Sequence, residues 1–181
     1  MRAHGDDGYT LIELLIVVGL IGLIAAAAVP ALFSNDEAAL DRAADRLAGA
    51  FRFAHAEAVR TGQPHGIVAS QSSQFVKIYR LDDTVNPPVV HYDVYDPLSK
   101  QLYDLRFDTE DRAPAISSIY FKFQGFWSPQ TYLGFAGTTG VPKYNDSGTI
   151  RMLQNGYVRL SHDGMTRTIT VSPLTGRVTV Q

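Results

Sequence analysis

The sequence predicts an α+β protein in which one long N-terminal helix packs on antiparallel β-sheets. Residues 11–33 form an apolar run that carries a single charge, Glu13. After a short polar stretch, apolar residues recur at steps of three and four as far as Gly62, which is the period of one helical face. Beyond Gly62, short segments rich in β-branched and aromatic residues alternate with turn residues. Short strands at this spacing favour antiparallel sheets laid against a helix.

Composition narrows the class of protein. The chain has 181 residues, of which 45% are hydrophobic, so it is long enough for one domain with a substantial core. A formal net charge of −2 gives no global attraction to nucleic acid or acidic lipid. The absence of cysteine excludes disulfides, thiolate metal sites and a cysteine nucleophile, and it leaves the location open.

The apolar run is long enough to cross a membrane. Residues 11–33 number 23, and a helix that rises about 1.5 Å per residue over this length spans a hydrocarbon core of about 30 Å. A helix that is apolar on every side is not the surface helix of a soluble domain. The run therefore belongs in a bilayer or in the core of a helical assembly.

Three interpretations of this run compete. A cleavable secretory signal would explain the short N-terminal piece and the run of alanines at residues 25–28. A plain signal anchor would explain the length. Neither explains Glu13, because a charge inside an apolar span costs on the order of 3 kcal/mol on insertion scales and calls for a partner or a purpose.

The residues around Glu13 supply the third interpretation. The contiguous residues Gly8-Tyr9-Thr10-Leu11-Ile12-Glu13 resemble the processing site of type IV prepilins and type II secretion pseudopilins. This resemblance implies that prepilin peptidase cuts between Gly8 and Tyr9 and methylates Tyr9, so that Glu13 becomes the fifth residue of the mature chain. Pro30 stands where such stalks commonly carry a helix-loosening proline.

Physical chemistry supports that resemblance. The freed amine of Tyr9 can pair with the Glu13 carboxylate of its own chain or of an adjacent subunit, which relieves the cost of a buried charge. A stalk packed beside a neighbour then gains a polar contact that sets its axial register. Gly22 and Ala26 form a small-xxx-small pair that lets another helix approach closely, although alanine-rich filler explains the pair equally well.

The leader departs from the class. Its sequence, MRAHGDDG, places Asp6 and Asp7 beside the predicted cut, where the class usually shows basic residues. Arg2, His4 and the amino terminus are the groups left to hold the leader on the cytoplasmic side under the positive-inside rule. This departure bears on processing efficiency and on the true start more than on the family.

The sequence predicts four consecutive parts: a leader at residues 1–8, a transmembrane and assembly helix at 9–33, an amphipathic stalk helix at 34–62 and a β-rich head at 63–181. Gly62, followed by Pro64, is a helix stop signal. The stalk helix is expected to bury one apolar stripe, which consists of Leu40, Ala44, Leu47, Phe51, Ala54 and Ala58.

Six strands are predicted in the head. Residues 82–114 form its least regular part, which we expect to be a long excursion between strands. Turn residues separate the strands, for example Asn155-Gly156, Asp163-Gly164 and Thr175-Gly176. The predicted strands are residues 75–81, 89–95, 119–126, 156–161, 166–172 and 177–181.

Two further segments indicate which family within the pilin class the sequence resembles. Residues 53–64, FAHAEAVRTGQP, look like the helix-to-strand junction of the GspH/FimT family, with His55 in place of the usual arginine. Residues 168–178, TITVSPLTGRV, are similar to that family's closing hairpin. The resemblance covers both ends of the chain and implies a pilin-like fold, a long stalk helix that carries a β-sandwich of antiparallel sheets.

No residue pattern indicates catalysis, and we expect no enzyme activity, metal, cofactor or small-molecule substrate. The histidines lack metal-ligand spacing, and nucleotide fingerprints are absent. Ser161, His162 and Asp163 are adjacent on a strand and cannot form a triad among themselves, so a turn explains them better. The acidic residues Asp104, Asp108, Glu110 and Asp111 lack calcium-loop spacing, and a solvated loop is the simpler interpretation.

DNA is considered because some FimT-type minor pilins bind it through a basic C-terminal tail. Here the tail has Arg177 but no second arginine two positions later, so any binding is expected to be weak and salt-sensitive. Phe126, Trp127 and Tyr132, near Lys122, have the chemistry to stack on bases, although aromatic residues in a β-rich segment are more often core.

The resemblance implies an H-type minor pseudopilin of the type II secretion system. Its expected place is the bacterial inner membrane, crossed once, with the head in the periplasm and the processed chain in a pseudopilus. Its expected partners are prepilin peptidase, membrane lipid and other pseudopilins or pilins, contacted through the stalk helices. A FimT-like minor pilin of a type IV pilus is the alternative, and a gel shift with double-stranded DNA at two salt concentrations separates the two. A membrane-tethered periplasmic enzyme is a third hypothesis.

Overall fold

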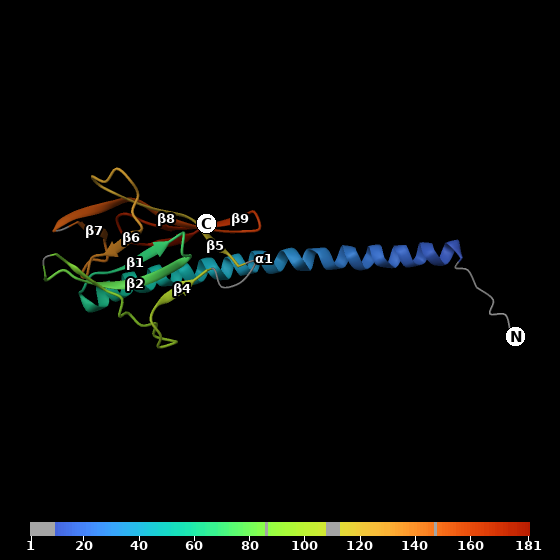
Figure 1. Ribbon diagram of the computed structural model, residues 1–181, viewed down its shortest axis with the longest axis horizontal. Coiled ribbons are helices and arrows are strands. Elements are labelled where there is room, and N and C mark those ends of the chain that lie inside the picture. The colour runs from blue at the N-terminus through green and yellow to red at the C-terminus, as the bar shows by residue number, and fades with distance from the viewer. Residues whose placement is uncertain (1–9, 86, 108–112, 147) are drawn as a thin grey trace. The chain divides into compact units, whose positions relative to one another are not determined.

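The structure is a computed structural model that describes residues 10–85, 87–107, 113–146 and 148–181, with the backbone alone described at residues 25–35. The chain divides into two compact units, residues 1–37 and residues 38–181. The helix α1, Leu11–Thr61, contributes residues to both units (Figure 1). The units are described in turn, the second one first, and residues 38–181 are called the head unit.

In the head unit, α1 buries the predicted stripe. All six residues of the stripe, from Leu40 to Ala58, have no exposed surface. Ala43, Ala48 and Ala50 are buried as well, so the buried face is wider than the stripe alone. The helix ends as predicted: Gly62 has a φ of 73°, and its N–H donates to the carbonyl oxygen of Ala58 at 3.0 Å. A left-handed glycine at this position is a common helix stop.

The described part of the head unit contains ten strands, and every pair between them is antiparallel. The strands are β1 His65–Ser70, β2 Phe75–Asp82, β3 Val89–His91, β4 Asp104–Arg106, β5 Ala115–Phe123, β6 Tyr132–Phe135, β7 Pro142–Asp146, β8 Thr149–His162, β9 Met165–Val171 and β10 Val178–Val180.

The long strand β8 joins two sheets. Its first residues, 149–152, pair with β7 and continue the sheet through β6, β1, β2 and β3, with β4 also pairing with β2. Its later residues lie between β5 and β9, and β10 pairs with β9. The predicted α+β class with a helix packed on antiparallel sheets is confirmed. The two sheets are continuous through this strand.

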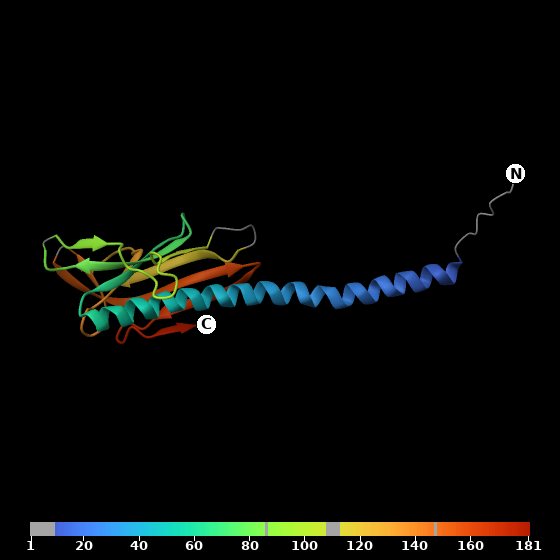
Figure 2. The same cartoon turned by 90° about the horizontal axis from the view of Figure 1, so that it is seen from below.

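One hydrophobic core holds the helix on the sheets. Figure 2 shows the helical residues of the head unit running along the strands. The ring centroids of Phe51 and Phe121 are 6.2 Å apart, and those of Phe53 and Tyr103 are 5.2 Å apart. Phe51, Phe121, Phe123 and Phe135 are the largest side chains with no exposed surface. Their burial supplies much of the apolar stabilisation of this unit.

The structure corrects several predicted strands. The predicted strand 119–126 is β5, which begins at Ala115 and ends at Phe123, and the predicted strand 89–95 shortens to β3. Residues 82–114 do connect β2 to β5, but they include β3 and β4, both of which pair with β2. The strands β1, β4, β6 and β7 were missed. β4 and β6 have only three and four residues. β1 and β6 include a glycine and β7 begins with a proline, residues that are rare inside strands.

Two similar turns enclose the ring of His55. Gly140, in the turn after β6, and Gly176, in the turn after β9, both have a φ of 67°. The N–H of Gly140 donates to the oxygen of Ala136 at 2.9 Å, and that of Gly176 donates to the oxygen of Ser172 at 2.9 Å. A Cβ on either glycine would lie closer than 3.0 Å to the imidazole. The helix is therefore held against both turns through one residue.

Candidate assembly segment

The apolar helix begins at a capped residue, Thr10. The N–H of Glu13 lies 3.0 Å from the carbonyl oxygen of Thr10 and 3.4 Å from its Oγ1, and the N–H of Leu14 donates to the same carbonyl at 3.2 Å. Thr10 is thus the N-cap of α1. The spacing Thr-x-x-Glu is a capping-box signature that could have been read from the sequence and was missed. Glu13, in the first turn, is also favourably placed against the helix dipole.

Residues 10–24 form what we call the assembly segment, and its apolar side chains are exposed. Every large apolar residue of the segment leaves between 50% and 81% of its surface uncovered, far more contiguous apolar surface than a soluble monomer usually shows. Apolar surface of this extent is typical of a site that contacts protein or membrane. These side chains are Leu11, Ile12, Leu14, Leu15, Ile16, Val17, Val18, Leu20, Ile21, Leu23 and Ile24.

Glu13 is the one charged residue of the assembly segment, and its side chain is exposed. Within residues 10–24 and the other described ranges, no side chain pairs with this carboxylate. Its predicted partner, the amine of Tyr9, lies outside the described residues, as does Gly8. Cleavage, methylation and the ion pair therefore stay predictions.

Of the predicted helix-packing pair, Gly22 and Ala26, the structure describes the surroundings of Gly22 only. A Cβ placed on Gly19 or Gly22 would meet nothing within 4 Å, so this helical surface is open to an approaching helix. The side chains of Ala26 and Pro30 lie outside the described ones. The backbone is helical at both positions.

No helix among the described residues is long and apolar enough to cross a membrane. The predicted transmembrane helix, residues 9–33, extends into positions 25–35, whose side chains are not described, and Tyr9 is also outside. The membrane-spanning role of this segment is therefore a prediction.

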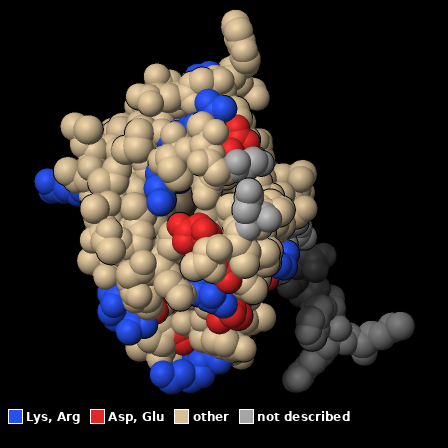
Figure 3. Space-filling view, turned by 90° about the vertical axis from the view of Figure 1, so that its left-hand side faces the viewer, with Lys and Arg blue, Asp and Glu red and all other residues tan. Residues whose placement is uncertain are grey.

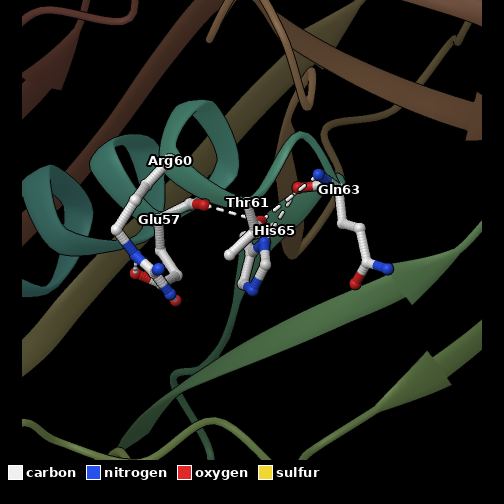
Figure 4. Close-up of polar contacts among 5 residues, drawn as sticks. All are labelled: Glu57, Arg60, Thr61, Gln63 and His65. Carbon is white, nitrogen blue, oxygen red and sulfur yellow. Dashed lines mark hydrogen bonds and ion pairs between the residues drawn. The ribbon is translucent and has the colours of Figure 1, made fainter.

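The family-like junction after the helix is held by local polar contacts (Figure 4). Glu57 and Arg60 form an ion pair, and the guanidinium of Arg60 lowers the pKa of the Glu57 carboxyl. The hydroxyl of Thr61 donates to the carbonyl of Glu57 at 2.8 Å and accepts from the N–H of Gln63 at 3.2 Å. Nδ1 of His65 lies 2.9 Å from the carbonyl of Gln63. These contacts shape the turn into β1.

The aromatic residues considered for DNA and Lys122 lie on β5, on β6 and in the connection between them, and DNA binding stays a prediction. The ammonium of Lys122 donates to the backbone carbonyls of Phe126 and Trp127, so it is already engaged. Phe126 is half-buried against Tyr144, but the side chain of Trp127 is 100% exposed, so Trp127 does not follow the tendency of aromatic residues in β-rich segments to be core. Figure 3 shows basic and acidic side chains interspersed on the face in view.

The residues weighed for catalysis and metal binding have structural roles. Asp163 and Gly164, with φ of 47° and 78°, form the tight turn between β8 and β9 that the sequence indicated. Asp104 pairs with Arg106 at 2.9 Å and lies 3.6 Å from Lys77. Asp108, Glu110 and Asp111 lie outside the described residues. Across the described part of the chain, no group of three or more histidine or acidic residues is arranged to hold a metal ion.

Comparisons with known proteins agree with the architecture. Residues 4–29 match the prokaryotic N-terminal methylation motif, which contains Glu13. Residues 43–175 match the family of the type II transport protein GspH, a span that covers most of the head unit. Neither the search of curated proteins nor the search of solved structures gives a match. Because the family match covers more than half of the sequence, the chain belongs to the GspH family of type II transport proteins.

Proposed function

We propose that this chain is an H-type minor pseudopilin of the type II secretion system. Prepilin peptidase cuts it between Gly8 and Tyr9 and methylates Tyr9. The helix of residues 9–33 crosses the bacterial inner membrane once and leaves the head in the periplasm. The processed chain then joins a pseudopilus that helps to export proteins, and its role is structural rather than catalytic.

One observation carries this proposal: the assembly segment exposes eleven large apolar side chains around a single carboxylate. Such a helix is stable when lipid or neighbouring helices cover it. It lies within the match to the N-terminal methylation motif and precedes a GspH-type head. Lipid covers the helix before assembly, and the helices of other pseudopilins cover it afterwards.

Glu13 gives this assembly its register. In lipid, the carboxylate is costly unless it is paired. The methylated amine of Tyr9 on an adjacent subunit offers the pair, and it does so at one axial position. The free energy of assembly is therefore most favourable when the first turn of the subunit lies level with the matching amine. Movement of the fibre is powered elsewhere, by a cytoplasmic ATPase that acts through other components.

The test is the substitution Glu13→Ala. It removes the carboxylate without shortening the apolar span, so insertion in the membrane is expected to persist. Incorporation into fibres, measured by shearing and immunoblotting, is expected to fall at least about tenfold, because loss of a buried pair costs more than about 1.4 kcal/mol. Asp45→Ala, which removes an exposed carboxylate of the same helix outside the segment, is the control and should assemble normally.

Normal incorporation of the Glu13→Ala chain would contradict the proposal. A membrane-tethered enzyme would tolerate this substitution, because its anchor needs only an apolar helix.

A further inference from the structure

The loop between β5 and β6, residues 124–131, is fixed to the sheets by backbone contacts at both ends. We call it the Trp127 loop. The N–H of Gln124 donates to the oxygen of Met152 at 3.0 Å, and the N–H of Gln130 donates to the oxygen of Phe121 at 2.8 Å. Both acceptors lie on strands, so the ends of the loop have little freedom.

Side chains fix the middle of the Trp127 loop. Lys122 Nζ donates to the carbonyl of Phe126 and, at 2.8 Å, to that of Trp127. The guanidinium of Arg151 lies 4.8 Å from the ring of Phe126, whose centroid is 5.4 Å from that of Tyr144. Cation–π and edge-to-face contacts of this kind hold an aromatic ring in one place. The loop is therefore preorganised.

Trp127 is the residue that this loop presents. Its side chain is 100% exposed, and it is the only tryptophan in the chain. Tryptophan is enriched among the residues that dominate binding energy, and a rigid backbone lowers the entropy lost when such a residue docks. A wholly exposed indole on a fixed loop is suited to insert into a partner protein. We call the side chain of Trp127 the knob.

A tyrosine-lined cleft adjoins the Trp127 loop. The cleft has a volume of about 320 Å³ and is lined by Tyr79, Tyr92, Tyr132 and Tyr144, among others. Tyr79 is the buried floor, and the rings of Tyr92 and Tyr132 each stand at 71° to it with centroids 6.5 Å away. Tyr132 directly follows the Trp127 loop, and Tyr144 contacts Phe126 within it.

We propose that two copies of this chain associate by exchanging tryptophans, with Trp127 of each copy inserted into the tyrosine cleft of the other. The cleft is large enough for one indole, and its walls offer ring faces and edges for aromatic pairing. Asp146, at the edge of the cleft, is paired with Arg151, so docking covers no unpaired carboxylate there.

The symmetry follows from the position of the two features. Because knob and cleft adjoin on one chain, a twofold axis satisfies both contacts at once, whereas a head-to-tail contact would leave one of each unused at the ends. Two aromatic anchors bury less area than a standard stable interface, so the dimer is expected to be weak, with dissociation at concentrations on the order of 10–100 μM.

Because Trp127 is the sole tryptophan, intrinsic fluorescence of the detergent-solubilised full chain reports its environment directly. The emission maximum is expected to move to shorter wavelength, and acrylamide quenching to fall at least twofold, as the chain is concentrated at constant detergent-to-protein ratio. Tyr92→Ala removes a half-exposed wall of the cleft and should abolish both changes. Tyr95→Ala, which removes an exposed tyrosine outside the cleft, should retain them.

A mixing experiment identifies the partner surface. The Tyr92→Ala chain carries the fluorescent knob without a complete cleft, and the Trp127→Ala chain carries an intact cleft and emits no tryptophan signal. Addition of excess Trp127→Ala chain to Tyr92→Ala chain is expected to restore the blue shift. An unchanged emission in this mixture, or a blue shift in the Tyr92→Ala chain alone, would overturn the proposal. Processing and fibre assembly through the N-terminal helix are independent of either outcome.

Discussion

At the scale of single residues, the tightest packing in the head unit surrounds His55. The ring lies edge-on to Phe135, with centroids 5.3 Å apart, and the backbones of Gly140 and Gly176 approach its other atoms. Its Nε2 is buried and has no hydrogen-bond partner within the described residues. The family resemblance indicates an arginine at this position, and no local pattern predicts that two turns distant in the sequence meet at its ring.

Alanine at Gly140 or Gly176 is expected to destabilise the fold by about 2–4 kcal/mol. The new Cβ would overlap the imidazole, and a φ of 67° is strained for any residue with a side chain. Gly164→Ala is the matched control, because its φ is 78° but its Cβ would meet nothing within 4 Å. That control should lose only about 1–2 kcal/mol. Urea denaturation followed by circular dichroism measures both, and equal losses would contradict the packing argument.

Ionisation of Tyr79 is expected to make the stability of the fold depend on pH in the alkaline range. Burial raises the pKa of its phenol, with smaller contributions from Tyr144, Tyr92 and Tyr132. The folded pKa therefore exceeds the unfolded value of about 10. The stabilising contribution is complete below that value and is lost as the pH rises through the folded pKa.

The substitution Tyr79→Phe removes this titration. Between pH of about 9 and about 11, the variant should lose less unfolding free energy than the parent chain. The same slope in the parent and in Tyr79→Phe would show that other groups dominate alkaline unfolding.

At the scale of elements, the helix was predictable and the small strands were not. Apolar residues at helical spacing from Leu40 to Ala58 determine which face is buried, and Gly62 marks the end, because both signals are local. The strands β4 and β6 have three and four residues and owe their existence to pairing with β2 and β1. Such pairing depends on tertiary contacts that no local pattern records.

The distinction between local sequence signals and tertiary contacts also applies to the candidate functional residues. The apolar run and Glu13 stand out in the sequence because a charge in such a run is costly. The exposure of Trp127 could not be predicted in this way, because an aromatic residue near strands is usually buried. The contacts of Lys122 and Arg151 with the backbone of this loop are tertiary contacts that no local pattern records.

The packing of α1 on the sheets depends most on Phe51. The side chain has no exposed surface and contacts Phe121, so Phe51→Ala should cost about 3–5 kcal/mol of unfolding free energy. Val59→Ala, on the same helix at a residue that is 45% exposed, should change stability by no more than about 0.5 kcal/mol. Denaturant titration of both variants checks the difference. A loss below about 1 kcal/mol for Phe51→Ala would mean that the helix contributes little to the core.

At the scale of the whole molecule, the two compact units differ in how much of their apolar side-chain surface is buried. The unit of residues 38–181 has a single hydrophobic core, which buries the apolar face of the helix and the inward side chains of the strands. The assembly segment, in the unit of residues 1–37, exposes nearly all of its own. A chain with one self-sufficient unit and one unit that needs a covering is suited to a subunit that is anchored first and assembled later.

The mature N-terminus tests the central claim most directly. Purified from its native membrane or fibre, the chain should begin at Tyr9 and carry one added methyl group on that residue's amine, as intact-mass and fragment-ion mass spectrometry would show. A chain in assembled fibres that keeps residues 1–8, or one that begins within or just after the alanines at 25–28, would contradict the account.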